Sequence, residues 1–241
     1  MGTVFSFDIR DRPTSAIRAG LDRAVRHLHT VDAVFSTYRR DSAVSRLGRG
    51  EIGLADCPPE VHEVLALCAR ATDDSDGWFS ITAGGTLDPS GLVKGWATEN
   101  ASRLLHEAGA QHTCVNGGGD IRLRGQAAPG TPWRIGIADP LRPGVPAAVV
   151  TASGDLAIAT SGTAERGAHI LDPYGGGPAT ELVSLTVIGP GLTTTDAYAT
   201  AAFARGNGSR AWLEGLDEYE ASAVLPDGRT WHTSGFPVHA H

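Results

Sequence analysis

Asp196 and Thr200 are the residues whose types and spacing first suggest chemistry. They lie in LTTTDAYATAAFARG, residues 192–206, which is typical of a helix beginning near Thr195. Side chains four residues apart share one face of a helix, so a carboxylate and a hydroxyl would lie side by side. Two such oxygens suit a hard cation. The alternative is that Asp196 only complements the helix dipole, and the segment taken alone favours this alternative.

His169 is a candidate proton acceptor. It lies in IATSGTAERGAHILDPYGG, residues 158–176, where a strand runs into a glycine-rich turn. Histidine titrates near neutral pH, so it can take a proton from a hydroxyl, and Asp172 could orient the ring from three residues away. The alternative is a structural histidine at a strand end, which the spacing alone favours.

Lys94 follows a loop that could contribute to a cation or phosphate site. The segment FSITAGGTLDPSGLVKGWATEN, residues 79–100, places Asp88 in a loop and Lys94 with its glycine at the start of an expected helix. Backbone carbonyls of such a loop are good Mg²⁺ ligands, and the lysine could contact a phosphate. The alternative is a surface loop with a lysine at a helix start.

Two further segments each have a structural and a functional interpretation. VNGGGDIRLRG places Gly117, Gly118 and Gly119 between strands, either as a hairpin turn or as a backbone that a phosphate or flat ring can approach. The spacing matches neither a dinucleotide fingerprint nor a P-loop. FSTYRRDSAVSRLGRG places Tyr38 beside two arginines, and a capped helix with a solvated basic face is the alternative there.

The remaining periodicities predict the elements that must position these residues. Hydrophobic residues recur at threes and fours from Thr14 to Phe35, which indicates an amphipathic helix. Further helices are expected in CPPEVHEVLALCARATDDSDG and KGWATENASRLLHEAGA, and strands in TVFSFDI, TCVNGGGDIRLRG, WRIGIAD, AAVVTASGDLAIAT, LVSLTVIG and ASAVLPDGRTWHT. No repeat or linker divides the chain. We therefore expect one α+β domain over residues 1–241, with a mixed or antiparallel sheet packed by helices.

Composition limits the partners. The 241 residues carry a net charge of −7, which argues against nucleic acid or an anionic membrane surface as the main partner. The three cysteines show no C-x-x-C spacing, and no apolar run is long enough for a membrane span. The N-terminus lacks the pattern of a leader, so a cytoplasmic protein is expected unless a leader was removed.

Taken in order along the chain, these segments resemble the ApbE family of FAD:protein FMN transferases, which is linked to thiamine biosynthesis. The matching segments are MGTVFSF, FSTYRRDSAVSRL, FSIT, LDPSGLVKGWA, VNGGGDI, ATSGT, HILDP and TTTDAYATAAFARG, and they span almost the whole chain. The resemblance implies a T-fold-like α+β architecture. It also implies Mg²⁺-dependent transfer of FMN from FAD to a threonine hydroxyl of a target protein, with release of AMP. Some members instead hydrolyse FAD to FMN and AMP.

The resemblance also implies roles for individual residues. Asp196 and Thr200 would ligate Mg²⁺ together with the main-chain oxygen of Gly91, for which Ser90 is the alternative. His169 would be the base that deprotonates the acceptor hydroxyl, and Asp196 would share the catalytic role through the metal. FAD would be contacted by Met1, Tyr38, Trp78, Phe79, Ser80, Asp88, Lys94, Gly117, Gly118, Gly119 and Ile170.

Three departures from the family pattern bear on FAD affinity and on acceptor choice. Ser80 stands where the family usually has an aspartate, and the segment between FSIT and LDPSG is short. The pattern K-G-Y-A-x-D ends here as KGWATEN, with Glu99 and Asn100 near the usual aspartate. A FAD pyrophosphatase and a non-catalytic FAD-binding protein are therefore the alternative functions.

Overall fold

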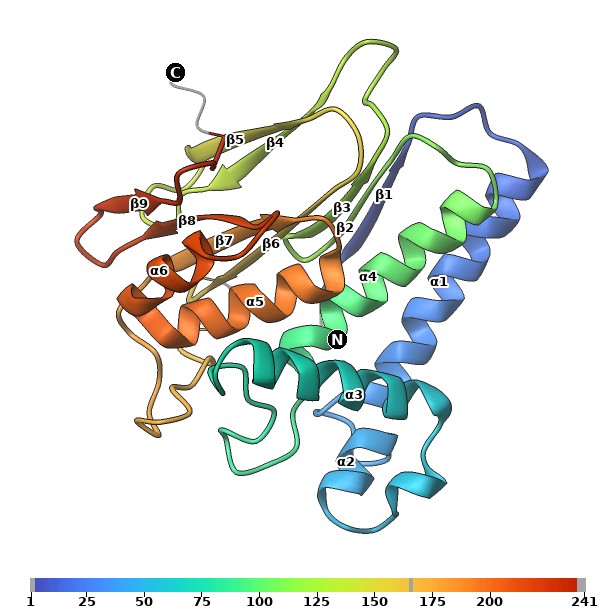
Figure 1. Ribbon diagram of the computed structural model, residues 1–241. Coiled ribbons are helices and arrows are strands. Elements are labelled where there is room, and N and C mark those ends of the chain that lie inside the picture. Colours follow the sequence, from blue (N-terminus) through green and yellow to red (C-terminus); the bar gives the residue numbers. More distant parts are fainter. Residues whose placement is uncertain (1–2, 165–166, 238–241) are drawn as a thin grey trace.

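A seven-stranded antiparallel sheet is the framework of the computed structural model, which describes residues 3–164 and 167–237 (Figure 1). Its strand order is β1-β2-β3-β6-β7-β8-β9, and β4 and β5 form a separate two-stranded ribbon. The strands are β1 Phe5–Ile9, β2 Thr113–Gly117, β3 Asp120–Arg124, β4 Trp133–Ala138, β5 Pro146–Ala152, β6 Leu156–Gly162, β7 Ser184–Gly189, β8 Glu220–Val224 and β9 Thr230–His232. The expected α+β class is confirmed, and every strand pair of the sheet is antiparallel.

The helices are α1 Ser15–Phe35, α2 Ala43–Gly48, α3 Pro59–Asp74, α4 Ser90–Glu107, α5 Leu192–Arg205 and α6 Ser209–Glu214, with short 3₁₀ turns at Leu54–Asp56 and Gly206–Gly208. Helices α1, α3, α4 and α5 overlap the segments where helices were expected, whereas α6 was not predicted. Across residues 3–164 and 167–237, none of these helices has both the length and the apolar character needed to cross a membrane.

The large sheet is covered differently on its two faces. Helices α1, α4 and α5 lie against one face, and the β4–β5 ribbon lies over the other (Figure 1). Alternation along β6 shows the two faces directly, because Ala157 and Ala159 pack with the α5 cluster whereas Ile158 packs with the ribbon. Strand β6 therefore contributes side chains to both the α5 cluster and the ribbon cluster. It ends at Gly162, shortly before His169 in the sequence.

Helix α1 forms as its sequence pattern predicts. The Thr14 hydroxyl caps it by accepting a hydrogen bond from the Ile17 backbone N–H at 3.1 Å. Its buried residues recur at threes and fours: Ile17, Gly20, Ala24, Leu28, Val31 and Phe35. Helix α1 packs along α4 and so supports, from behind, the helix that carries Lys94.

The starts of α4 and α5 correct two of our expectations. Helix α4 begins at Ser90, so Lys94 lies in its second turn rather than at its start. Helix α5 begins at Leu192, and Thr195 lies inside it, where its hydroxyl donates to the Gly191 carbonyl at 2.8 Å. Asp196 is consequently beyond the first turn, which has no acidic residue, and the helix-dipole interpretation does not account for it.

The close approach of α1 and α4 gives a test of this packing. A Cβ on Gly20 would lie only 2.5 Å from the Ala108 Cβ at the end of α4. We expect Gly20→Val to lower the free energy of unfolding by about 1–3 kcal/mol, because the overpacked helices must separate. Urea unfolding measures this. Ala19→Val, on the exposed side of the same helix, is the control, and an equal loss in both variants would contradict the packing argument.

Candidate functional site

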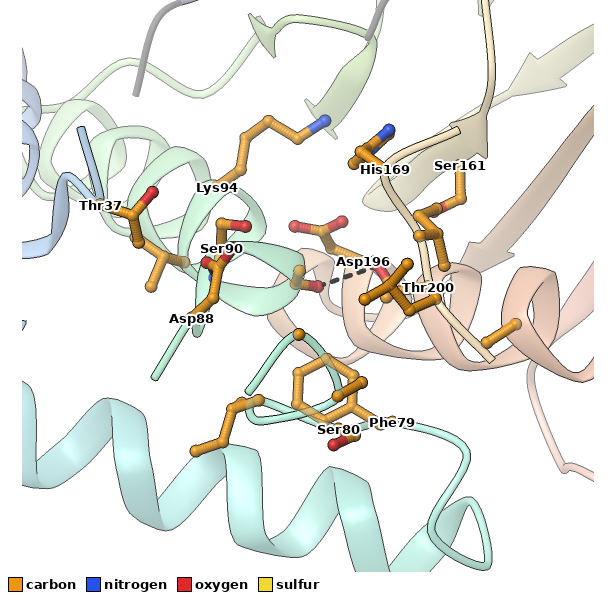
Figure 2. Close-up of a pocket in the computed structure, with 18 of the residues that line it drawn as sticks. Thr37, Phe79, Ser80, Asp88, Ser90, Lys94, Ser161, His169, Asp196 and Thr200 are labelled. Carbon is orange, nitrogen blue, oxygen red and sulfur yellow. Dashed lines mark hydrogen bonds between the residues drawn. The ribbon is translucent and has the colours of Figure 1, made fainter. Parts of the chain in front are cut away.

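Most of the sequence-predicted site residues line one cavity, of about 310 Å³, between α4, α5 and three loops (Figure 2). Those in its lining are Tyr38, Trp78, Phe79, Ser80, Asp88, Gly91, Lys94, His169, Ile170, Asp196 and Thr200. Met1 lies outside the described residues. Cavities of this size with convergent polar groups are typical of ligand sites, so the cavity is the candidate site.

Three oxygen-bearing groups meet where α4 and α5 cross. The Thr200 hydroxyl donates to the Gly91 carbonyl at 3.2 Å, and Asp196 lies one turn earlier on the same helix (Figure 2). A side chain on Gly91 would collide with Thr200, because its Cβ would lie 2.9 Å from the Thr200 Cγ2. The absence of that side chain lets the carbonyl approach the hydroxyl.

Asp196 is buried beside a second carboxylate. Only 4% of Asp196 is exposed, and the neighbouring Asp120 is fully buried. Burial and the neighbouring Asp120 raise the pKa of Asp196 well above its usual value, although Lys94 opposes the shift. A cation at these oxygens would replace the missing positive charge.

The donor chemistry fits a hard cation with an incomplete protein shell. The Asp196 carboxylate, the Thr200 hydroxyl and the Gly91 carbonyl offer only oxygen, which Mg²⁺ prefers. Within the part of the chain that the structure describes, no group of three or more His, Cys, Asp or Glu could hold a metal. This set therefore suits an ion that draws its remaining ligands from water or from phosphates.

Lys94 is held by groups that the sequence did not connect to it. Its ammonium lies 2.8 Å from Asp120 Oδ2 and donates to the Gly118 carbonyl at 3.4 Å. Gly117, Gly118 and Gly119 therefore lie behind Lys94, and among the described residues the cavity lining does not include them. The expected packing of these glycines against a cofactor has no counterpart in the cavity.

His169 faces Asp196 across the cavity, with Ser161 beside it (Figure 2). Its Nδ1 lies 3.0 Å from the Gly167 carbonyl, which can only accept a hydrogen bond, so Nδ1 carries the proton in the neutral ring. Nε2 is then left to accept a proton from a bound hydroxyl.

The expectation that Asp172 orients His169 is wrong. The Asp172 carboxylate accepts the Tyr174 backbone N–H at 2.8 Å and shapes its own turn. The physical reason is local: an aspartate two residues before a backbone N–H readily forms this turn. The Gly167 carbonyl takes the orienting role instead.

Some site residues were missed by the sequence analysis. Asp120 follows the three glycines of VNGGGDIRLRG but was given no role, and Thr37 and Ser161, which both line the cavity, were given none either. Asp120 also accepts the Thr160 backbone N–H at 3.3 Å, which ties β3 to β6 beneath the site. The only sequence signal was an aspartate at a strand start after three glycines.

Comparison with known proteins places these features in a family. The model of the ApbE family matches residues 1–87 and 83–223. The FAD:protein FMN transferase of Vibrio cholerae is 35% identical over 129 residues, 50% of this chain and 39% of that protein. The FAD:protein FMN transferase of Treponema pallidum is 33% identical over 171 residues, 64% of this chain and 47% of that protein. The aligned region thus spans less than half of each of these relatives.

A solved structure shows the same fold. The ApbE protein of Thermotoga maritima superposes with a TM-score of 0.85 and is 23% identical in sequence, over 98% of this chain and 95% of that chain. At this identity the likeness concerns the fold, and the chemistry has to be argued from the residues of the cavity.

The buried carboxylate gives a prediction about metal binding. Asp196→Asn keeps an oxygen that can accept the Gly95 N–H but removes the charge. We expect millimolar Mg²⁺ to raise the melting temperature of the wild-type protein but not of this variant. A ligand that binds the native state and not the unfolded state stabilises the native state, and the variant would have lost that ligand. Without Mg²⁺, the variant should melt at or above wild type, since a buried charge is gone.

Calorimetric melting with and without Mg²⁺ checks both points. Asp227→Asn, at an exposed turn between β8 and β9, is the control and should keep the response to Mg²⁺. An equal Mg²⁺-dependent rise in Asp196→Asn and wild type would exclude Asp196 as a ligand.

Proposed function

The chain belongs to the ApbE family, and on this premise we propose that it is a Mg²⁺-dependent FAD:protein FMN transferase. It would transfer FMN from FAD to a threonine hydroxyl of a target protein and release AMP. The observation that carries the proposal is the single cavity that joins the oxygens of Gly91, Asp196 and Thr200 to His169. The names of the relatives support this reaction, and the residues of the cavity are of the types that it would need.

The oxygen cluster would hold the metal. Asp196, Thr200 and the Gly91 carbonyl would be the protein's ligands, with the phosphates of FAD filling further positions. Bound there, Mg²⁺ would neutralise the charge of the pyrophosphate and favour departure of AMP. The fixed contact of Asp196 with the Gly95 N–H, at 2.7 Å, keeps the carboxylate in place for this role.

His169 would supply the base. As the threonine oxygen bonds to the FMN phosphorus, the bond from that phosphorus to the AMP oxygen breaks, and the hydroxyl proton passes to His169 Nε2. The Gly167 carbonyl fixes the ring in the tautomer that can accept this proton. Ser161 lines the cavity beside His169, and the acceptor hydroxyl would approach on this side (Figure 2).

The rest of the cavity would hold FAD. Aromatic and apolar groups from Tyr38, Trp78, Phe79 and Ile170 give it surfaces suited to flat rings. Lys94 lies on the same wall as the cation site, where its charge would favour a phosphate. Asp88 also supports the wall itself, because its carboxylate accepts the Ser90 N–H at 2.9 Å where α4 begins.

The proposal is tested by assaying AMP after incubation with FAD and Mg²⁺, with and without a candidate threonine-bearing acceptor domain. We expect AMP only with the acceptor, together with an acceptor band that keeps flavin fluorescence in denaturing gels. AMP without an acceptor would identify a FAD pyrophosphatase instead. FAD binding without AMP in either reaction would leave a flavin-binding protein and would overturn the proposal.

The role of His169 is tested separately. We expect His169→Gln to slow FMN transfer by roughly a hundredfold or more, because the base is lost, while FAD binding persists. Transfer rates and the dissociation constant for FAD measure the two effects. His62→Gln, on α3 away from the cavity lining, is the control and should transfer at the wild-type rate. Parallel loss of FAD binding and transfer in His169→Gln would indicate a structural histidine.

A further inference from the structure

An aromatic and charged cluster lies at the rim of the cavity, and of its members only Trp78 has a place in the proposed reaction, as part of the FAD surface. Its members are Asp76 and Trp78, from the turn after α3, Tyr174, from the loop after His169, and Arg205, at the end of α5. We call it the Tyr174 cluster. Tyr174 is 66% exposed, yet its ring and its hydroxyl both have fixed partners.

Tyr174 joins two segments that are far apart in the sequence. Its ring lies edge-on to Trp78, with centroids 4.9 Å apart, and its hydroxyl donates to the Asp76 carbonyl. Gly77 makes room for this contact, because a Cβ there would lie 2.6 Å from the Tyr174 hydroxyl oxygen. Gly77 also has a φ of +82°, which glycine adopts readily. Both the space for Tyr174 and the backbone conformation therefore favour glycine at this position.

The loop that carries Tyr174 is closed by its own backbone. The Ala179 N–H donates to the Ile170 carbonyl at 2.9 Å, and the Asp172 N–H donates to the Gly177 carbonyl at 2.7 Å. Residues 170–179 therefore form a compact unit with His169 directly at its base. A contact that holds Tyr174 in place holds the start of this unit as well.

Helix α5 completes the cluster. Arg205 Nη1 lies 3.4 Å from Asp76 Oδ2, and its guanidinium lies 6.0 Å from the centre of the Trp78 ring. Through Asp76 and Trp78 the cluster links the loop of His169 to the helix that carries Asp196. These are the two sides of the cavity between which the proposed reaction takes place.

We propose that Tyr174 is a positioning residue that holds the His169 loop at its working distance from the oxygens of Asp196 and Thr200. The inference rests on the proposed function and deepens it. The hydroxyl bond to Asp76 fixes the loop, whereas the ring contact also supports Trp78, which lines the cavity. The two parts of the side chain can therefore be separated by substitution.

Tyr174→Phe removes only the hydroxyl and is the decisive variant. We expect faster amide hydrogen exchange in residues 169–178 and a fall in kcat for AMP formation of about threefold to tenfold, the effect of one net hydrogen bond. The KM for FAD should stay at the wild-type value, since the ring still supports Trp78. Tyr174→Ala should lower kcat further and also raise the KM for FAD.

The matched control is Tyr219→Phe, which also removes one hydroxyl and whose ring packs against Tyr198, with centroids 4.9 Å apart. Its exchange in residues 169–178 should equal that of wild type. Unchanged exchange in Tyr174→Phe would overturn the proposal, and so would faster exchange with unchanged kcat. If wild type formed no AMP, the proposed function would fail on that assay alone, while exchange would still decide whether Tyr174 holds the loop.

Discussion

The contact between α4 and α5 at Gly95 and Asp196 is the constraint on which the site depends. A Cβ on Gly95 would lie 2.6 Å from the Asp196 Cβ and 2.7 Å from the Leu192 carbonyl, so only glycine allows the helices this close. The approach lets the Gly95 N–H donate to the carboxylate at 2.7 Å and removes that carboxylate from water. It also brings Gly91, one turn earlier, to Thr200, one turn later. One small residue thus sets the geometry of every oxygen in the cluster.

Burial of the Asp196 carboxylate is electrostatically unfavourable, and the positive charge of Lys94 compensates it only in part. Lys94 pairs with Asp120, so a single ammonium stands against the two carboxyl groups of Asp120 and Asp196. Removing a charge from water without a partner is unfavourable, and structures retain such groups mainly where a ligand or a metal compensates them. A cation bound in the proposed site would reverse the local field, so that phosphates would be attracted to this pocket despite the net charge of −7.

Sequence patterns predicted the elements well because their causes are local. The buried stripe of α1 and the pairing of Asp196 with Thr200 on α5 follow from the helical period alone. Three features could not be read in this way. The start of α5 depends on which residue first accepts a helical hydrogen bond. The role of Asp120 depends on its partner Lys94, which is distant in the sequence. The tautomer of His169 depends on the Gly167 carbonyl in its own loop. Each arises from folding of the chain, and spacing in the sequence does not encode it.

The pairing of the first strand has a consequence for how the protein is made. In the sheet, β1 pairs with β2, and Phe5 lies opposite Gly117. During synthesis, β1 and the apolar stripe of α1 therefore leave the ribosome long before their partners exist. Topologies dominated by such distant pairings fold slowly, and the waiting surfaces are open to wrong association. The apolar surfaces of β1 and α1 accordingly stay uncovered until β2 and α4 have been synthesised.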